Sequence, residues 1–369
     1  MIVAAGLVYL YPTLTSKPAL RGITAIDHFL STQAQQQRFS GTVLVAQNGK
    51  VLLDKGYGWA DQDQHLSNKP GTRFRIGSVT KQFTAMAILL LQEMGKLRVQ
   101  DVVCQYISDC PAAWKTITIH HLLTHTSGIP EYVTSFPLQQ PATPPQLIAA
   151  IETKPLDFAP DSRFSYSNSG YAILGAIIEK VSGEPYSSFL QRAIVGVLHL
   201  SNTGYDQNFP PLPAHATGYK QPGVKADFVD MSVPYAAGAL YSTVDDLYRW
   251  DTALFNRTFA AGESLTQMFS PQVTFCDEQG TICAVSECAA QRNNCASYGY
   301  GWVLEQAPVD QQYVRVIWHS GSIPGFASLN DYYPDQRLTL IVLSNLETLF
   351  DNPTSIRSIV ESALIRHLF

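Results

Sequence analysis

The chain has 369 residues, of which 46% are hydrophobic and 15% are charged, and its formal net charge at pH 7 is −5. This composition can bury a sizeable core in one or two domains. The acidic balance argues against nucleic acid as the main partner, and no apolar run reaches the roughly 18 residues of a membrane span.

The chain begins with a short apolar stretch, Ile2 to Leu10. It lacks a basic segment in front and a clear cleavage site. Residues 1–20 are therefore either the remnant of a signal peptide or anchor, or a loosely packed and disordered leader.

The first regular elements follow at once. Helical periodicity predicts a helix from Gly22 to Gln37, and alternation predicts strands at Gly41–Gln47 and Lys50–Gly58. Asn48-Gly49 between the two strands is the strongest short signal for a hairpin. A further helix begins near Ser78 and runs to Gly95, because its apolar residues recur at helical spacing.

The middle of the chain, from about residue 101 to 270, predicts mostly helices and long loops. The expected helices lie near Gln146–Glu152, Gly170–Val181 and Val244–Phe255. Strands return later, and the chain closes with an amphipathic helix. These last elements are expected at Tyr298–Leu304, Tyr313–Trp318, Ser328–Tyr333, Leu338–Ser344 and Thr354–Leu368.

The segment Ser78-Val79-Thr80-Lys81 is the part of the sequence that most clearly indicates a catalytic function. A serine hydroxyl is a poor nucleophile at neutral pH and needs a base within hydrogen-bond reach. A lysine three residues later on a helix lies one turn along the same face. Taken alone, the motif also fits Ser78 as a helix cap and Lys81 as a solvated side chain.

Two later segments favour the catalytic interpretation of this motif over the structural one. Tyr166-Ser167-Asn168 precedes a helical pattern, and His319-Ser320-Gly321-Ser322 closes an apolar run that reads as a strand. In chain order the sequence thus supplies a nucleophile with its lysine, a Tyr-x-Asn, and a basic residue followed by a hydroxyl and glycine. The corresponding set in penicillin-binding proteins and class A β-lactamases is S-x-x-K, S-D-N and K-T-G.

With these segments, the chain resembles the β-lactamase-related serine hydrolases. Within them it is similar to the branch of class C β-lactamases, D-alanyl-D-alanine carboxypeptidases, D-aminopeptidases and β-lactamase-fold esterases, which carries Tyr-x-Asn. The resemblance runs from about residue 25 to the C-terminus. It also includes Phe74–Gly77, His121–Gly128, Ala237–Thr243 and Gly321–Phe326.

The resemblance implies an α+β fold of the β-lactamase/transpeptidase type, with an antiparallel sheet flanked by helices. Residues 21–100 and 296–369 would form the sheet region. Residues 101–295 would form a mostly helical inserted region with a cysteine-rich loop at 272–297. The active site is expected where the two regions meet.

The resemblance also implies roles for the residues. Ser78 would attack a carbonyl carbon while Lys81, Tyr166 or both take its proton, and Asn168 would orient Lys81 and donate to a substrate amide. We expect Lys81 to lower the pKa of Tyr166 by stabilising a phenolate. The backbone N–H groups of Ser78 and Ser322 would form the oxyanion hole.

His319, Ser320 and Gly321 would contact the substrate. Class C β-lactamases have lysine where this chain has His319, and a partly protonated histidine should bind an anionic group less firmly and more pH-dependently. We therefore expect hydrolysis of a small peptide, amide or ester with weak or no β-lactamase activity. The alternatives are a true β-lactamase and a non-catalytic, penicillin-binding-like scaffold.

No metal or organic cofactor is expected, and the partner is a small-molecule or peptide substrate. His121 and His125 have i, i+4 spacing, but the metalloprotease pattern H-E-x-x-H is absent because leucines occupy positions 122 and 123. We therefore predict a structural role for the histidines at 120, 121 and 125. No G-x-S-x-G occurs, which argues against an α/β-hydrolase.

The six cysteines predict disulfides rather than a metal site, since their spacings are not C-x-x-C and no histidine lies nearby. Cys104 and Cys110 are expected to pair with each other, and Cys276, Cys283, Cys288 and Cys295 to pair among themselves. Disulfides imply an oxidising compartment, which would be secreted, periplasmic, lumenal or at the cell surface.

Overall fold

The computed structural model describes residues 22–208, 214–277, 279–285, 295–309, 312–347 and 356–365. The expected leader at 1–20 lies outside these residues. Within them, no helix has both the length and the apolar character needed to cross a membrane.

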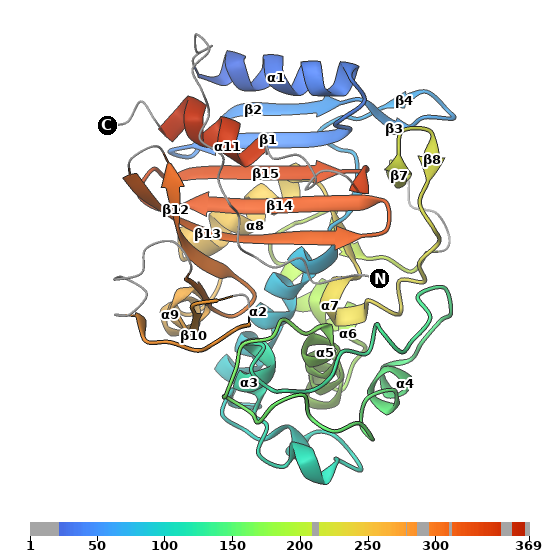
Figure 1. The fold of residues 1–369 in the computed structure, drawn as a ribbon, viewed down its shortest axis with the longest axis vertical. Helices are drawn as coiled ribbons and strands as arrows, with labels where there is room; N and C mark the ends of the chain where they lie inside the picture. The colour runs from blue at the N-terminus through green and yellow to red at the C-terminus, as the bar shows by residue number, and fades with distance from the viewer. Residues whose placement is uncertain are drawn as a thin grey trace.

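The described helices are α1 (Ile23–Gln35), α2 (Thr80–Glu93), α3 (Ile119–Leu123), α4 (Pro144–Ala149), α5 (Asn168–Ser182), α6 (Tyr186–Leu190), α7 (Tyr235–Gly238), α8 (Val244–Phe255), α9 (Gly262–Phe269) and α11 (Ile356–Val360). Helices α1 and α11 lie at the end of the molecule beside β1 (Gly41–Gln47) and β2 (Lys50–Tyr57), α8 lies behind the sheet that these two strands belong to, and α2 to α7 lie at the opposite end (Figure 1). Single 3-10 or π turns occur at η1 (Gly77–Val79), η2 (Val103–Gln105), η3 (Ala112–Trp114), η4 (Gln191–Val195) and η6 (Glu361–Ile365).

The principal sheet has the strand order β10-β11-β12-β13-β14-β15-β1-β2, and all of its pairs are antiparallel. Its strands are β1 (Gly41–Gln47), β2 (Lys50–Tyr57), β10 (Val273–Phe275), β11 (Ala296–Tyr298), β12 (Val303–Val309), β13 (Gln312–Ile323), β14 (Phe326–Tyr333) and β15 (Leu338–Ser344). Smaller sheets join β3 (Trp59–Asp61) to β4 (Leu66–Ser67), β5 (Phe74–Arg75) to β9 (Leu240–Ser242) and β6 (Gly204–Tyr205), and β7 (Tyr219–Gln221) to β8 (Val224–Lys225).

Two hydrophobic cores lie on opposite faces of this sheet. Along β1, Val43 and Val45 point to the core shared with α1 and α11, whereas Leu44 and Ala46 point to the core that contains α2 and α8. This alternation is the period of two that a strand imposes on its side chains. The predicted α+β class, with an antiparallel sheet covered by helices, is confirmed.

Helix α2 is the buried axis of the helical region. Every residue from Thr80 to Leu91 is buried, so the helix has no solvated face to balance its apolar ones. The turn η1 precedes it and lies against β13 and β14 of the sheet. The start of α2 is therefore at the junction of sheet and helices, as expected.

Most of the predicted elements are confirmed with small changes of boundary, and α8 has the predicted bounds. The Asn48-Gly49 hairpin is present, and both residues have positive φ, at 53° and 77°. The strand predicted at Tyr298–Leu304 is wrong, because the chain turns there. Gly301 has φ of 77° and the Gly299 N–H donates to the Trp302 carbonyl, which separates β11 from β12.

The closing helix differs as well, because α11 passes into the π-type turn η6 at Glu361. The last residues of the prediction, from 366 on, lie outside the described part of the chain.

Candidate active site

Ser78 is the middle residue of η1 and is half-buried, so that its side chain remains open to solvent. The turn requires glycine before it. Gly77 has φ of 50°, and a Cβ added there would lie 2.8 Å from the backbone nitrogen of Ser322 on β13. Glycine thus allows the turn and the strand to approach closely.

Lys81 lies one helical turn beyond Ser78 and is completely buried. Its Nζ has three oxygen neighbours at hydrogen-bond distance: Ser78 Oγ at 3.1 Å, Asn168 Oδ1 at 2.8 Å and the carbonyl oxygen of Ala237 at 2.9 Å. Three acceptors satisfy the three protons of an ammonium group. The same arrangement also suits a neutral amine, whose lone pair can accept the hydroxyl proton of Ser78.

Burial lowers the pKa of Lys81 to about 7, because it disfavours the charged form. The carboxylate of Glu131 acts in the opposite direction and raises this pKa. A lysine with a pKa near neutrality can serve as a general base at physiological pH.

Tyr166 lies beside this pair, with its ring centroid 4.7 Å from Lys81 Nζ. The expectation that Lys81 lowers the tyrosine pKa is wrong. Burial raises the pKa of Tyr166, and the nearby Ser78 side chain offsets this only in part. The physical reason is that burial disfavours the charged phenolate, and the carboxylate of Glu131 raises the Tyr166 pKa further.

Asn168 is the first residue of α5, and its side-chain Oδ1 accepts a hydrogen bond from Lys81. On its other side is Glu131, which sequence reasoning missed. Glu131 Oε2 accepts the backbone N–H of Asn168 at 2.7 Å and the side-chain Nδ2–H at 3.3 Å. The only signal in the sequence is an acidic residue shortly after the His121–Gly128 segment, and no spacing links it to the other motifs.

His319 lies on β13 with 4% of its surface exposed. Its Nδ1 lies 2.6 Å from the carbonyl of Ser320, so Nδ1 carries the proton and donates, while Nε2 at 3.0 Å accepts from the Tyr298 hydroxyl. Burial, followed by the positive charge of Lys81, lowers the pKa of His319 to about 3. The expected partial cation is therefore wrong, and the imidazole is neutral with both nitrogens hydrogen-bonded inside the protein.

The remaining residues of this strand line the approach to Ser78. Ser320 is half-buried, Gly321 is buried and Ser322 is exposed. A Cβ added to Gly321 would lie 2.9 Å from the backbone nitrogen of Ser78, so the backbones of β13 and η1 are in direct contact. Both candidate oxyanion donors, the N–H groups of Ser78 and Ser322, thus lie at one junction.

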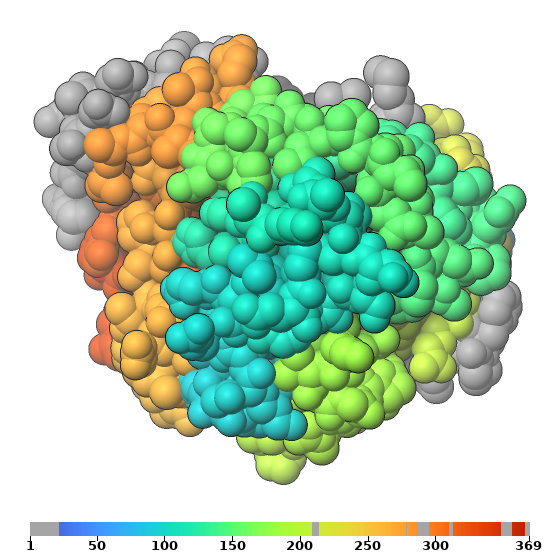
Figure 2. All heavy atoms as spheres, turned by 90° about the horizontal axis from the view of Figure 1, so that it is seen from below, coloured from blue at the N-terminus to red at the C-terminus, as the bar shows by residue number. Residues whose placement is uncertain are grey.

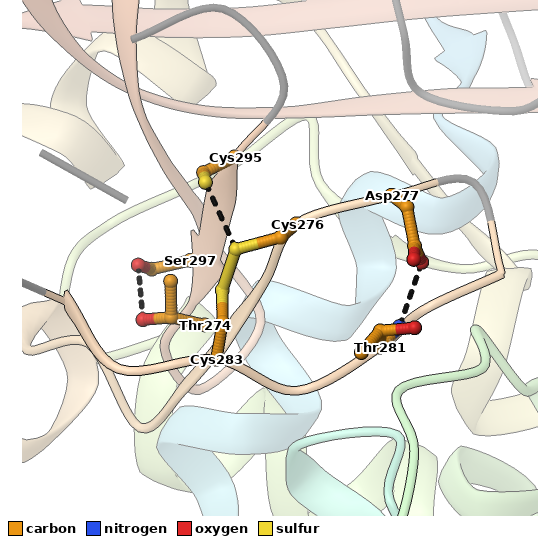
Figure 3. The surroundings of a disulfide bond; sticks show 7 residues. All are labelled: Thr274, Cys276, Asp277, Thr281, Cys283, Cys295 and Ser297. Atoms are coloured by element: carbon orange, nitrogen blue, oxygen red, sulfur yellow. Dashed lines mark hydrogen bonds between the residues drawn. A yellow bond between two sulfur atoms is a disulfide. The ribbon is translucent and has the colours of Figure 1, made fainter. Parts of the chain in front are cut away.

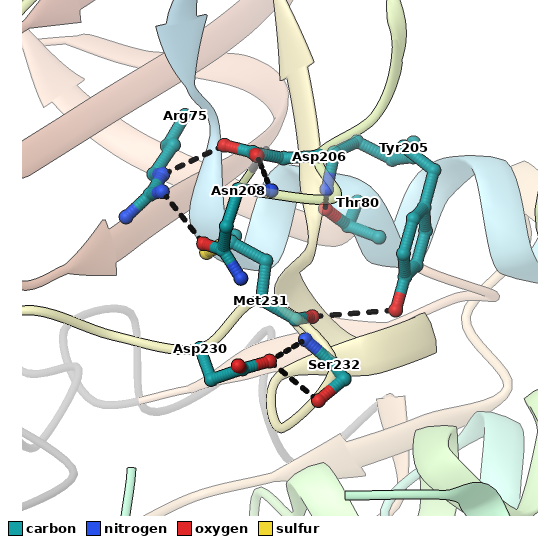
Figure 4. Close-up of polar contacts among 9 residues, drawn as sticks. Arg75, Thr80, Tyr205, Asp206, Asn208, Asp230, Met231 and Ser232 are labelled. Atoms are coloured by element: carbon teal, nitrogen blue, oxygen red, sulfur yellow. Dashed lines mark hydrogen bonds and ion pairs between the residues drawn. The ribbon is translucent and has the colours of Figure 1, made fainter. Parts of the chain in front are cut away.

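Hydrogen bonds from neighbouring strands hold η1 in place. Ser328 on β14 donates its hydroxyl to the Ile76 carbonyl at 2.7 Å, and Thr80 accepts the backbone N–H of Leu240 at 3.1 Å. Figure 4 shows the second contact beside the ion pair of Arg75 with Asp206, which is 2.8 Å long. These hydrogen bonds connect the residues on either side of η1 to the strands β14 and β9.

The clustered histidines have partners within the protein. His125 Nδ1 accepts the backbone N–H of Ser167 at 3.0 Å, and the His125 ring lies 4.3 Å from that of Tyr166, centroid to centroid. His121 closes a capping box with Thr118 at the start of α3. The expected structural role fits these contacts.

A separate cavity of about 470 Å³ lies between the α3 region and the segment from α9 to β12. In Figure 2 these two parts of the chain, cyan and orange, adjoin each other on the helical end of the molecule. The side chains that line this cavity carry uncharged amides, hydroxyls and imidazoles, and none of them is a predicted site residue. The lining residues are Gln100, Thr118, His120, His121, Gln267, Gln272 and Tyr300.

Two disulfides are present in the described residues, Cys104–Cys110 and Cys276–Cys283. Cys288 lies outside the described residues. Among the residues that are described, Cys295 has no disulfide partner, and its Sγ is 3.0 Å from that of Cys276 (Figure 3). The sulfurs at 276, 283 and 295 lie within 4.8 Å of one another. Two of them are joined to each other, which removes the thiolates that a metal would need.

The loop closed by the Cys276–Cys283 disulfide contacts the segment that leads to Tyr166. The Gly280 carbonyl accepts the backbone N–H of Phe164, two residues before Tyr166, and the Phe164 ring stacks on Phe275 at 4.0 Å. The crosslinked loop thus fixes the path of the chain into the Tyr166 segment.

The chain is similar to known proteins over most of its length. The family profile described as Beta-lactamase matches residues 25–364. PbpX of Bacillus subtilis (strain 168) is 30% identical over 338 residues, covering 90% of this chain and 78% of that protein. Penicillin-binding protein 4* of the same strain is 31% identical over 345 residues, which cover 87% of this chain and 71% of that protein.

A solved structure agrees with these sequence matches. The octameric penicillin-binding protein homologue from Pyrococcus abyssi has a TM-score of 0.77 and 26% identity, covering 93% of this chain and 77% of that one.

Proposed function

Since the chain belongs to the beta-lactamase family, we propose that it is a serine hydrolase that forms an acyl-enzyme at Ser78. The observation that carries the proposal is the contact of Lys81 Nζ with Ser78 Oγ at 3.1 Å, within a buried site that lowers the lysine pKa to about 7. A substantial fraction of Lys81 is then a free amine at neutral pH, directly beside the hydroxyl it must activate.

The hydrogen bonds of Lys81 decide where its lone pair points. A neutral amine has two N–H groups and one lone pair. The Asn168 Oδ1 and the Ala237 carbonyl can only accept, so they take the two N–H groups. The third direction leads to Ser78, whose hydroxyl proton passes to Lys81 as Oγ bonds to the substrate carbonyl carbon.

The negative charge of the tetrahedral intermediate forms on the former carbonyl oxygen. The backbone N–H groups of Ser78 and Ser322 are the proposed donors, and removing one such donor typically costs about 3 kcal/mol of transition-state stabilisation. Lys81 then returns its proton to the leaving group, directly or through the Tyr166 hydroxyl, as the bond to the leaving group breaks. A water molecule deacylates the enzyme by the same route in reverse.

The substrate class that we propose is a small peptide, amide or ester, of the carboxypeptidase or esterase kind. The neutral state of His319 supports this choice, because an uncharged imidazole contributes no ionic attraction to a substrate carboxylate. β-Lactams that depend on such an anchor should acylate Ser78 slowly. The two disulfides support a secreted, periplasmic or other oxidising location.

Covalent labelling tests the nucleophile. Incubation with a fluorophosphonate or a fluorescent penicillin, followed by peptide mass spectrometry, should place the label on Ser78, and the label should disappear in Ser78→Ala. Failure of every acylating probe to label the intact protein would instead favour a non-catalytic scaffold.

A substrate panel tests the class. We expect turnover of p-nitrophenyl esters of short acids, and we would compare kcat/KM for D-Ala-D-Ala peptides, D-amino-acid amides and cephalosporins. Rapid hydrolysis of nitrocefin would make the protein a β-lactamase and would contradict the role assigned to the neutral His319.

A further inference from the structure

The carboxylate of Glu131 lies behind Asn168, on the side away from Lys81. Its Oε2 accepts two hydrogen bonds from Asn168, one from the backbone N–H at 2.7 Å and one from Nδ2 at 3.3 Å. Its Oε1 is 3.4 Å from the backbone nitrogen of Val133. Asn168 begins α5, so its backbone N–H has no partner within the helix, and Glu131 supplies one.

Only one orientation of the Asn168 side-chain amide satisfies all of these hydrogen bonds. A carboxylate only accepts, so Nδ2 must face Glu131, and Oδ1 must then face Lys81. With the amide turned over, Nδ2 would face Lys81 and would donate to the lone pair of the neutral amine. Ser78 would lose its base without any change in the position of Lys81.

We propose that Glu131 is a positioning residue: by fixing the Asn168 amide, it directs the lone pair of Lys81 toward Ser78. The inference rests on the proposed function, because it concerns the activation of Ser78. It adds a residue that touches neither the substrate nor the nucleophile.

The charge of Glu131 has a second effect on the same lysine, since it favours the ammonium form and raises the Lys81 pKa. The other groups that face Lys81 do not supply this effect. The rings of Tyr166 and Tyr171 lie 4.7 and 5.4 Å from Nζ, and both tyrosines have raised pKa values. His125 and His319 have lowered pKa values and are neutral near pH 7.

Two substitutions separate the two effects. Glu131→Gln keeps an oxygen that can accept the Asn168 backbone N–H but removes the charge. Glu131→Met keeps the approximate size but removes both. We expect kcat for an ester to fall about ten- to hundred-fold in Glu131→Met, the range typical of lost orienting partners, with KM little changed. Glu131→Gln should retain most of kcat at pH 8.

The Lys81 pKa provides a readout that does not depend on activity. Lysine labelled with ¹³C at Cε reports protonation by NMR, and Lys81→Arg identifies the Lys81 signal. The midpoint should move to lower pH in Glu131→Gln and stay unchanged in the control Glu152→Gln, which removes one negative charge just after α4. The acid limb of kcat/KM should move by the same amount.

The outcomes are distinct. A wild-type kcat in folded Glu131→Met would overturn the positioning role of Glu131. An unchanged Lys81 midpoint in Glu131→Gln would overturn the effect of its charge on Lys81. If Glu131→Met does not fold, kcat of Glu131→Gln at pH 8 decides: a value near wild type supports positioning by the retained oxygen, and a loss of about ten-fold or more contradicts it. If wild-type protein hydrolyses nothing and resists labelling while the midpoint moves, the proposed function fails and the coupling between Glu131 and Lys81 stands.

Discussion

The pH dependence of ester hydrolysis tests the identity of the base most directly. Lowering the pH protonates Lys81, whose pKa is about 7 because the side chain is completely buried. The free amine fraction falls from about 90% at pH 8 to about 1% at pH 5, so kcat/KM should drop by about two orders of magnitude over that range. The carboxylate of Glu131 raises this pKa, so the midpoint depends on its charge as well as on the burial of Lys81.

Other groups near Ser78 should not produce this limb. The pKa of His319 is about 3, well below the range, and the pKa of Tyr166 is raised above its usual value, so the tyrosine stays protonated throughout. The sign follows from the depressed lysine pKa: activity is present above it and is lost as pH falls through it.

The assay is the initial rate of p-nitrophenyl ester hydrolysis between pH 5 and 9, followed at a wavelength where the absorbance of the product does not vary with pH. Ser78→Ala provides the background at each pH. A flat profile down to pH 5 would refute the reasoning, because it would assign the base to a carboxylate or to no titrating group.

Three further predictions concern the frame of the site. Gly321→Ala should abolish most labelling of Ser78, because the new Cβ would lie 2.9 Å from the Ser78 nitrogen; unchanged labelling kinetics would argue against the close approach of β13. Asp331→Asn breaks a buried bidentate ion pair with Arg357, whose bonds are 2.8 and 2.6 Å long. It should lower the free energy of unfolding, measured in urea, by about 3–5 kcal/mol. A decrease below about 1 kcal/mol would contradict the burial of the pair. Non-reducing peptide mapping should recover Cys104 linked to Cys110 and Cys276 linked to Cys283, and a Cys276–Cys295 peptide alone would contradict the second pairing.

Local patterns were sufficient for much of the fold. The Asn48-Gly49 turn and the helix over Val244–Phe255 were predicted correctly because each depends on neighbouring residues: a turn that needs positive φ, and an apolar stripe of helical period. The family resemblance is also confirmed, since its motifs are short segments read in order along the chain. The strand expected at Tyr298–Leu304 is wrong because Gly301 adopts a positive φ and the Gly299 N–H donates to the Trp302 carbonyl, a turn that alternating residues do not indicate.

Burial explains the errors at the candidate site. The sequence shows that His319 and Tyr166 are titratable, but their protonation depends on how much water reaches them and on the groups they face. Both are enclosed where β13 meets the helical region, so the histidine is neutral and the tyrosine keeps its proton. Glu131 was missed for a related reason: its partner Asn168 is 37 residues away, and no local pattern connects them.

The order of the residues alone thus determined the family and the proximity of Ser78 and Lys81, because S-x-x-K on a helix places both groups on one face whatever surrounds them. Tertiary structure decided the chemistry of that pair. Only the packed chain encloses Lys81 and aligns acceptors from two distant segments around it, and the free energy of a charge depends on its three-dimensional surroundings rather than on its neighbours in sequence.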